Sequence, residues 1–208
     1  MKQKQTLITR LAGSHRSIAS RLLLLTLLLF TTTAQAILTQ TIELRAGWNW
    51  VSFNVDITLD DLKAALMAAV PGTGTTIKSQ DNITTYYNGT RWRGALNSLD
   101  LDLTQMYKIK VPQDCEITLE GMPIDPTEHP VTIYQGDNWI GFPLNGEMPV
   151  TNVFDGFAQE GDIIKSKTAF AVYTGTKWRG TLQNLTPGQG YVYESAINDD
   201  RIFDFPSY

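Results

Sequence analysis

The sequence predicts a mainly β fold of two tandem homologous units, each with about six or seven short strands and one short helical insertion. A nine-residue motif, GWNWVSFNV, begins at Gly47 and returns as GDNWIGFPL at Gly136. Three more motifs follow each copy in the same order: IKS at 77–79 and 164–166, WRG at 92–94 and 178–180, and QxY at 105–107 and 189–191. Motifs kept in order with small deletions between them are typical of a repeated unit. Short strands separated by turn residues predict a small barrel or a compact two-layer sheet.

The first 36 residues have the features of a secretory signal peptide. They carry five basic residues and no acid, then an apolar run at Leu22–Phe30, and they end on Ala34-Gln35-Ala36. The run is shorter than the about 20 residues that span a bilayer. We therefore expect cleavage before Ile37 and an exported chain with no transmembrane span, located in the periplasm, at the cell surface or outside the cell.

A proline-rich stretch divides the rest of the chain. Residues 121–130 contain three prolines in ten positions, which is typical of a linker. The two predicted β units are therefore residues 37–120 and residues 131–208.

The first unit is expected to begin with strands over 37–45 and Trp48–Val55. Alternation places Phe53 on one face of the second strand and Trp50 on the other. Because both faces are apolar, we expect a central strand, with Trp50 and its counterpart Trp139 in the structural core.

A helix is predicted over Thr58–Val70. Thr58 and Asp61 match a capping box, and leucines recur at helical spacing behind them. Pro71-Gly72 ends the helix. The equivalent segment of the second unit, residues 150–157, is shorter and should form one or two turns.

A hairpin is predicted around Asn88-Gly89, a dipeptide that suits a two-residue turn. This register places Arg91 opposite Tyr86 and Arg93 opposite Thr84. The other strands are expected at residues 75–80, 105–111, 115–119, 191–193 and 202–205.

Composition excludes several classes of function. Removing the signal leaves 12 basic residues against 21 acids, a net charge of −9, which argues against a nucleic-acid partner. Cys115 is the only cysteine, so the chain forms no internal disulfide. Its acidic neighbours raise a thiol pKa, which favours a half-buried strand residue over a nucleophile.

No catalytic, metal or cofactor site is predicted. The mature chain has one histidine, His129, and it lies in the linker, which disfavours a catalytic triad. Asp100 and Asp102, like Asp199 and Asp200 beside Asn198, are expected to be solvated loop acids. A weak calcium site and an acid-pair glycosidase remain as alternatives.

Two sets of residues are candidates for binding. Trp92 and Trp178 share a face with glycine and leucine and should point inward as core residues. Trp48 has Asp137 as its counterpart and should be exposed at the start of its strand, which makes it a weak candidate for sugar binding. Four cations on the hairpins form the second candidate, a docking surface for an anionic glycan or an acidic protein: Arg91, Arg93, Lys177 and Arg179.

The motifs GWNWVSF, IKSQ, WRG and PGQGYVY resemble the tandem "GWNWIS…IKSQ…WxGxL…PGxGYxY" β-repeats of secreted and surface proteins of gut-type Gram-negative anaerobes. The resemblance covers nearly the whole mature chain and implies an accessory or interaction module. We therefore expect a non-enzymatic exported protein acting in adhesion, cell-surface assembly or interaction. The alternatives are a carbohydrate-binding module and, more distantly, the acid-pair glycosidase.

Overall fold

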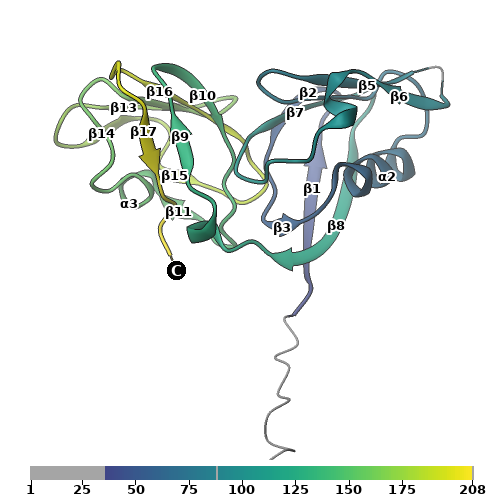
Figure 1. Ribbon diagram of the computed structural model, residues 1–208, viewed down its shortest axis with the longest axis horizontal. Coiled ribbons are helices and arrows are strands. Elements are labelled where there is room, and N and C mark those ends of the chain that lie inside the picture. The colour runs from purple at the N-terminus through teal and green to yellow at the C-terminus, as the bar shows by residue number, and fades with distance from the viewer. Residues whose placement is uncertain (1–35, 88, 208) are drawn as a thin grey trace, which may run out of the picture. The chain divides into compact units, whose positions relative to one another are not determined.

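The computed structural model describes residues 36–87 and 89–207 (Figure 1). The predicted signal peptide lies outside the described residues, apart from Ala36.

The fold is mainly β, as predicted, and its two largest sheets have the same strand order. In the first sheet the order is β2(Gly47–Val51), β7(Tyr107–Val111), β4(Thr76–Lys78), β5(Ile83–Tyr87) and β6(Arg91–Arg93). In the second it is β10(Gly136–Ile140), β16(Tyr191–Ser195), β12(Ile163–Lys165), β13(Phe170–Tyr173) and β14(Trp178–Gly180). All neighbouring strands in these two sheets are antiparallel. No sheet in the described residues closes into a barrel, so the small barrel, one of the two predicted forms, is not found.

Smaller sheets add strands beyond the six or seven expected in each unit. β1(Leu38–Leu44) pairs along its whole length with β8(Cys115–Pro123), which also pairs with β3(Val55–Asp56). The second half adds two short pairs: β9(Val131–Ile133) with β17(Arg201–Phe203), and β11(Met148–Pro149) with β15(Asn184–Leu185). Two short 3₁₀ helices, η1(Ala95–Ser98) and η2(Pro126–Glu128), complete the described elements.

Helix α2(Leu59–Ala69) follows its sequence signals closely. The Thr58 hydroxyl accepts a hydrogen bond from the Asp61 N–H at 3.2 Å, and the Asp61 carboxylate accepts one from the Thr58 N–H at 2.9 Å, so the predicted capping box is confirmed. Leu59, Leu62 and Leu66 are buried where the helix packs against β8. The second helix, α3(Val150–Val153), is a single turn.

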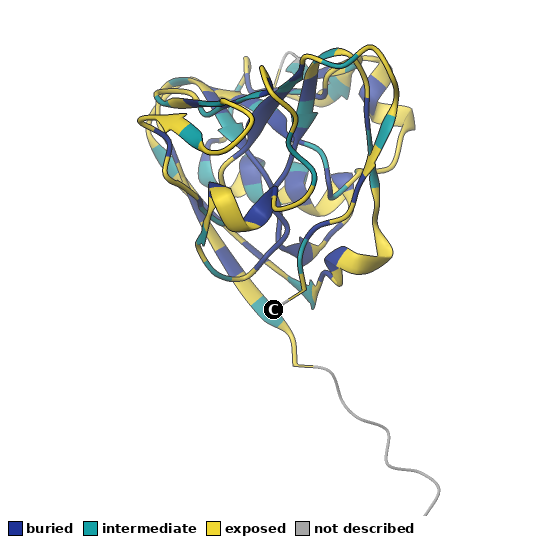
Figure 2. Ribbon diagram, turned by 90° about the vertical axis from the view of Figure 1, so that its left-hand side faces the viewer, coloured by how far each residue is buried: buried dark blue, intermediate teal, exposed yellow. Residues whose placement is uncertain are grey.

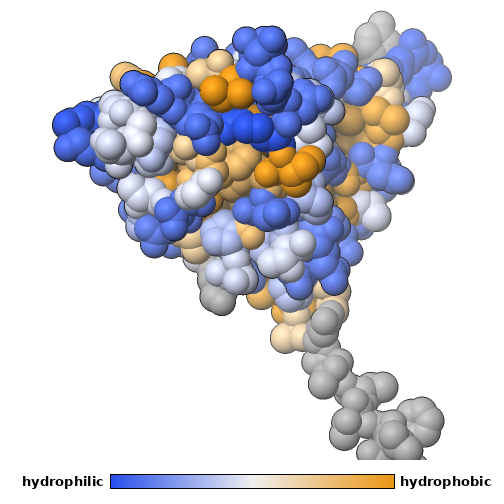
Figure 3. All heavy atoms as spheres, turned by 60° about the vertical axis from the view of Figure 1, so that its left-hand side comes forward, coloured by the Kyte–Doolittle hydropathy of each residue, from blue (hydrophilic) through white to orange (hydrophobic). Residues whose placement is uncertain are grey.

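Each half has its own hydrophobic core. In Figure 2 the buried residues lie on the inner parts of the chain and the exposed ones on the outer loops. Phe53, Leu62 and Ile109 lie in the first core, and Phe142 and Phe154 in the second. On the face seen in Figure 3, the remaining apolar surface forms patches interrupted by hydrophilic residues, which is usual for a folded surface.

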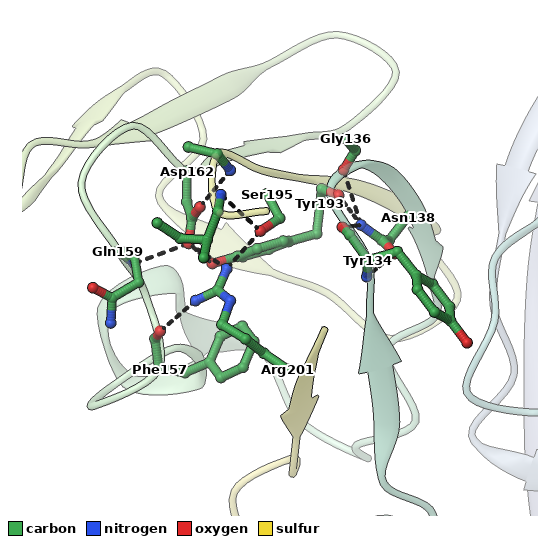
Figure 4. Close-up of polar contacts among 11 residues, drawn as sticks. Tyr134, Gly136, Asn138, Phe157, Gln159, Asp162, Tyr193, Ser195 and Arg201 are labelled. Carbon is green, nitrogen blue, oxygen red and sulfur yellow. Dashed lines mark hydrogen bonds and ion pairs between the residues drawn. The ribbon is translucent and has the colours of Figure 1, made fainter. Parts of the chain in front are cut away.

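The motif asparagine has the same role in both halves. The Asn138 side-chain oxygen accepts a hydrogen bond from the Tyr134 N–H, and its Nδ2 donates to the carbonyls of Tyr134, Gly136 and Tyr193, at 2.8–3.2 Å in all (Figure 4). Asn49 makes the same four contacts with Arg45, Gly47 and Ile109. Each asparagine therefore closes the turn before its strand and ties it to the neighbouring strand, which explains its presence in both copies.

We expect Asn138→Asp to lower the free energy of unfolding by roughly 3 kcal/mol, because a carboxylate cannot donate to three carbonyls and would be left buried among them. Urea denaturation measures the effect. The matched control is Gln135→Asp, which makes the same charge change at an exposed position of the same turn. Equal losses in the two variants would contradict the role assigned to the Asn138 amide.

Two expectations about strands are wrong. The segment 48–55 is not one central strand, because β2 ends at Val51 and lies at the edge of its sheet, as β10 does in the other. The hairpin connection is longer than the expected turn: Tyr87 pairs with Arg91 and Thr85 with Arg93, which shifts the register by one residue. Tyr86 and Thr84, which were expected opposite the two arginines, are therefore not their cross-strand partners.

Candidate functional site

The edges of β2 and β10 are completed by segments from the opposite half. The Ser52 N–H donates to the Gly188 carbonyl at 3.2 Å, and the Gly190 N–H donates to the Trp50 carbonyl at 3.2 Å. In the reverse direction, the Gly141 N–H donates to the Thr104 carbonyl at 2.6 Å, and the Met106 N–H to the Trp139 carbonyl at 3.4 Å. We call this exchange of edge hydrogen bonds the reciprocal joint. It leaves neither strand with a free edge at this position.

The loops that follow β4 and β12 reinforce the reciprocal joint. Gln80 accepts a hydrogen bond from the Trp139 N–H at 2.8 Å and donates one to the Asp137 carbonyl at 3.2 Å. At the equivalent position of the second half, Lys167 donates to the Trp48 carbonyl at 2.6 Å. Both edge strands are therefore fixed in position by a side chain from the other half.

Two equivalent residues meet at the joint and differ in size. A Cβ atom on Gly190 would lie 2.2 Å from Cγ of Met106, and a Cβ on Gly141 would lie 2.8 Å from the Gln105 carbonyl oxygen. Met106 is fully buried and occupies the space that the glycine leaves. The joint therefore packs a large residue of the first half against a small one of the second.

Beside this joint lies a surface that we call the tryptophan–lysine face: Trp48, Trp50, Lys78, Lys108, Lys110 and Trp139. Strand pairing places Trp48 opposite Lys110, and Lys108 between Trp50 and Lys78, so the residues from β2, β7 and β4 share one side of the first sheet. Trp139 is contributed by β10. The face therefore combines residues from both halves.

The Lys108 ammonium lies over both indoles of this face. It is 4.6 Å from the Trp50 ring centroid and 4.0 Å from that of Trp139, while the Lys78 ammonium is 5.4 Å from Trp139. These are cation–π distances. Partial burial and the nearby Lys78 charge lower the pKa of Lys108, and the Asp137 charge opposes this effect.

Trp48 borders a hollow on this face. Its side chain is 39% exposed, as the sequence predicted, and it lines a pocket of about 360 Å³ together with Trp50, Lys78 and Lys108. Among the described residues, no carboxylate forms an ion pair with Lys78, Lys108 or Lys110. The pocket is therefore cationic and aromatic.

The equivalent surface of the second half is neutralised. Asp137 stands in place of Trp48, Val192 in place of Lys108, and Glu194 in place of Lys110. The only lysine of this set, Lys165, pairs with Glu194 and lies 3.6 Å from the Asp137 carboxylate. These contacts raise the pKa of Lys165, the Glu194 hydrogen bond most of all.

The prediction that Trp50 and Trp139 belong to the core is wrong. Both are half-buried and lie outside the two hydrophobic clusters, because their side of the sheet is covered by lysine side chains and not by a second layer. Trp92 and Trp178 are also half-buried, but they pack against the edges of the two cores.

The four hairpin cations lie away from this face. Arg91, Arg93, Lys177 and Arg179 are all exposed, and three of them lie on β6 and β14, the outer edge strands of the two sheets. Charged residues on short edge strands hinder strand pairing between molecules. That placement accounts for them without a ligand, and docking there stays a prediction.

A buried polar network in the second half has no counterpart among the predicted sites (Figure 4). The Asp162 carboxylate accepts hydrogen bonds from Arg201 at 2.9 Å, the Tyr193 hydroxyl at 2.5 Å, and the N–H groups of Gln159 and Ala196 at 2.9 Å. Burial acts to raise the pKa of Asp162, but these donors outweigh it and hold the pKa below its usual range. Every described partner is a structural group, so the network fastens β17 to the second sheet.

The predicted loop acids and the cysteine have ordinary roles. The Asp102 carboxylate accepts hydrogen bonds from the Thr104 N–H and hydroxyl and from Gln105, so it is used inside its own loop. Asp100 is exposed. Burial raises the pKa of the half-buried Cys115, and the Asp114 charge adds to this effect. Within the described residues, no three histidine, cysteine or acidic side chains are placed to hold a metal ion.

No protein-family model, no curated protein and no solved structure matches the chain. In the described part of the chain, no helix has the length and apolar character needed to cross a membrane.

Proposed function

We propose that the chain is a non-enzymatic interaction module of an exported protein, and that it binds an anionic partner through the tryptophan–lysine face. The observation that supports this most directly is the set of three lysines on that face, none of which forms an ion pair in the described structure, although the mature chain carries a net charge of −9. The export features of residues 1–36 and the resemblance to surface-protein repeats agree with such a role.

The charge arrangement gives the face its selectivity. Its three lysines contribute +3, whereas the counterparts of these lysines and of Trp48 in the second half are one lysine, one valine and two acids, a charge of −1. A local cationic area on an acidic protein attracts anions to one place and repels them from the remaining surface. Adhesion to an anionic surface polymer fits this pattern.

A neutral-sugar module is the second candidate, because Trp48 presents an exposed indole beside a pocket. The two candidates differ in their dependence on salt: binding through lysines weakens as ionic strength screens the charges, and stacking on an indole does not. The glycosidase alternative is disfavoured, because Asp102 is engaged within its own loop.

To test the proposal, we would measure binding of residues 37–208 to immobilised polygalacturonate, heparin, polyglutamate and neutral dextran at low and high salt. At least one anionic polymer should bind in a salt-sensitive manner. Lys78→Gln with Lys108→Gln should weaken that binding by about tenfold or more, because each lysine can make a charge-assisted hydrogen bond.

The matched control is Lys165→Gln, which removes the equivalent lysine in the second half, where acids already neutralise it. This control should bind as the unmodified chain does. If no anionic polymer binds, or if the control loses as much affinity as the double variant, the proposal is wrong.

A further inference from the structure

We infer that the ligand of the tryptophan–lysine face is a carboxylated saccharide of the hexuronate type, bound at one site per chain with a sugar ring on the Trp48 indole. The inference rests on the proposed function and adds the chemical class of the ligand and its stoichiometry. Three features of the described structure carry it: the walls of the pocket, the rigid presentation of Trp48, and the loss of the equivalent pocket in the second half.

The pocket walls fit a ligand that is partly apolar and partly anionic. Trp48 and Trp50 supply aromatic surface, and Lys78 and Lys108 supply ammonium groups, around a volume of about 360 Å³. A pyranose ring has a face of C–H groups that packs on an indole, and a hexuronate also carries a carboxylate that a lysine can bind. Neutral sugars would use only the indole, and small inorganic anions only the lysines.

The backbone that presents Trp48 is held in a fixed position. Lys167 donates to its carbonyl at 2.6 Å, and Asn49, the next residue, closes the turn before the strand. An aromatic side chain on a fixed backbone loses less conformational entropy on binding than one on a mobile loop. The exposed indole therefore provides a ready platform, whereas Trp50 and Trp139 are already covered by Lys108.

The reciprocal joint disfavours an acidic peptide as the ligand. Extended peptides commonly bind by adding a strand to a free sheet edge. Here the edges of β2 and β10 are already hydrogen-bonded to segments 188–190 and 104–106. At these positions a peptide would find side chains but no free sheet edge, whereas a saccharide needs none.

The second half explains the stoichiometry. In the second half, Asp137 stands at the position equivalent to Trp48, and Glu194 pairs with the remaining lysine, Lys165. A carboxylated ligand would meet two carboxylates there. Duplication of the sheet therefore does not duplicate the site, and binding should show one site and not the twofold avidity that two docking surfaces would give.

Titration calorimetry of residues 37–208 with tetragalacturonate tests the inference, with cellotetraose as the neutral probe and tetraglutamate as the peptide probe. We expect one site for tetragalacturonate and affinity at least about tenfold weaker for the other two probes. Trp48→Ala and Lys78→Gln should each weaken tetragalacturonate binding by about tenfold, and Lys165→Gln should leave it unchanged. Thermal denaturation of each variant checks that the fold is retained.

Several results would overturn the inference and leave the proposed function standing. Tetraglutamate or a sulfated oligosaccharide binding more tightly than tetragalacturonate would assign another class of anion. Binding that depends on Lys78 and not on Trp48 would remove the stacked sugar ring. Two equivalent sites per chain would contradict the neutralisation of the second half. Failure of every anionic polymer in the preceding experiment would instead overturn both proposals.

Discussion

Asp162→Asn should lower the free energy of unfolding by about 3–5 kcal/mol, because it leaves the largely buried Arg201 guanidinium without its carboxylate. Asn would also offer one acceptor oxygen where the N–H groups of Arg201, Gln159 and Ala196 now share two. A loss of this size is a large part of the total stability of a domain. Thermal and urea denaturation measure it.

The effect of Asp162→Asn should depend on pH. The pKa of Asp162 is lower in the folded state than in the unfolded state, so its contribution is complete above the unfolded value and is lost as pH falls through the folded value. The difference in the free energy of unfolding between the unmodified chain and Asp162→Asn should therefore narrow only in acid. Tyr193→Phe is the graded control, because it removes one donor and keeps the ring, and should cost about 1 kcal/mol. If Asp162→Asn costs no more than this control, the ion pair does not hold β17.

The second large effect is expected at the reciprocal joint. Gly190→Met should destabilise the protein by roughly 3 kcal/mol or more, because even its Cβ would lie 2.2 Å from Cγ of Met106, an atom close to the backbone that cannot move away easily. Met106→Gly should cost a similar amount by leaving a cavity.

Combining the two changes distinguishes a specific fit from general sensitivity. In the double variant the large residue comes from the second half and the small one from the first, so the volume at the joint is restored. In a double-mutant cycle, we expect the double variant to lose about 1–3 kcal/mol less free energy of unfolding than the sum of the two single losses. Additive losses would show that the two residues do not share one space.

Local signals in the sequence predicted much of the fold. The capping box at Thr58 and Asp61 depends on residues three positions apart, and it is present as expected. The mainly β class likewise follows from repeated short strands. Such features succeed because the chemistry that creates them lies within one turn or one strand.

The candidate site was harder to predict because it depends on contacts between strands that are far apart in the sequence. Alternation showed that Trp50 and Phe53 point to opposite sides of the strand, but it could not show that lysines cover one of those sides. The signal that could have found the face was present: Trp48 and Lys110 both have acidic counterparts in the second copy.

The Asp162 network was missed for a related reason. Arg201, the partner of Asp162, is 39 residues away in the sequence. The counterpart of Asp162 in the first half is Thr75, so comparison of the two copies did not indicate a conserved acid. An aspartate directly before the apolar pair Ile163-Ile164 was the available clue, because a charge entering a buried strand requires a partner.

The difference in size between Met106 and Gly190 at the reciprocal joint also means that the two halves cannot replace each other. In a chain built from two first halves, Met106 would face another methionine at a position with room for one. In a chain built from two second halves, glycine would face glycine and a void would remain. Each half therefore packs well against the other and poorly against a copy of itself. The difference in volume between these two side chains is enough to make the halves non-interchangeable.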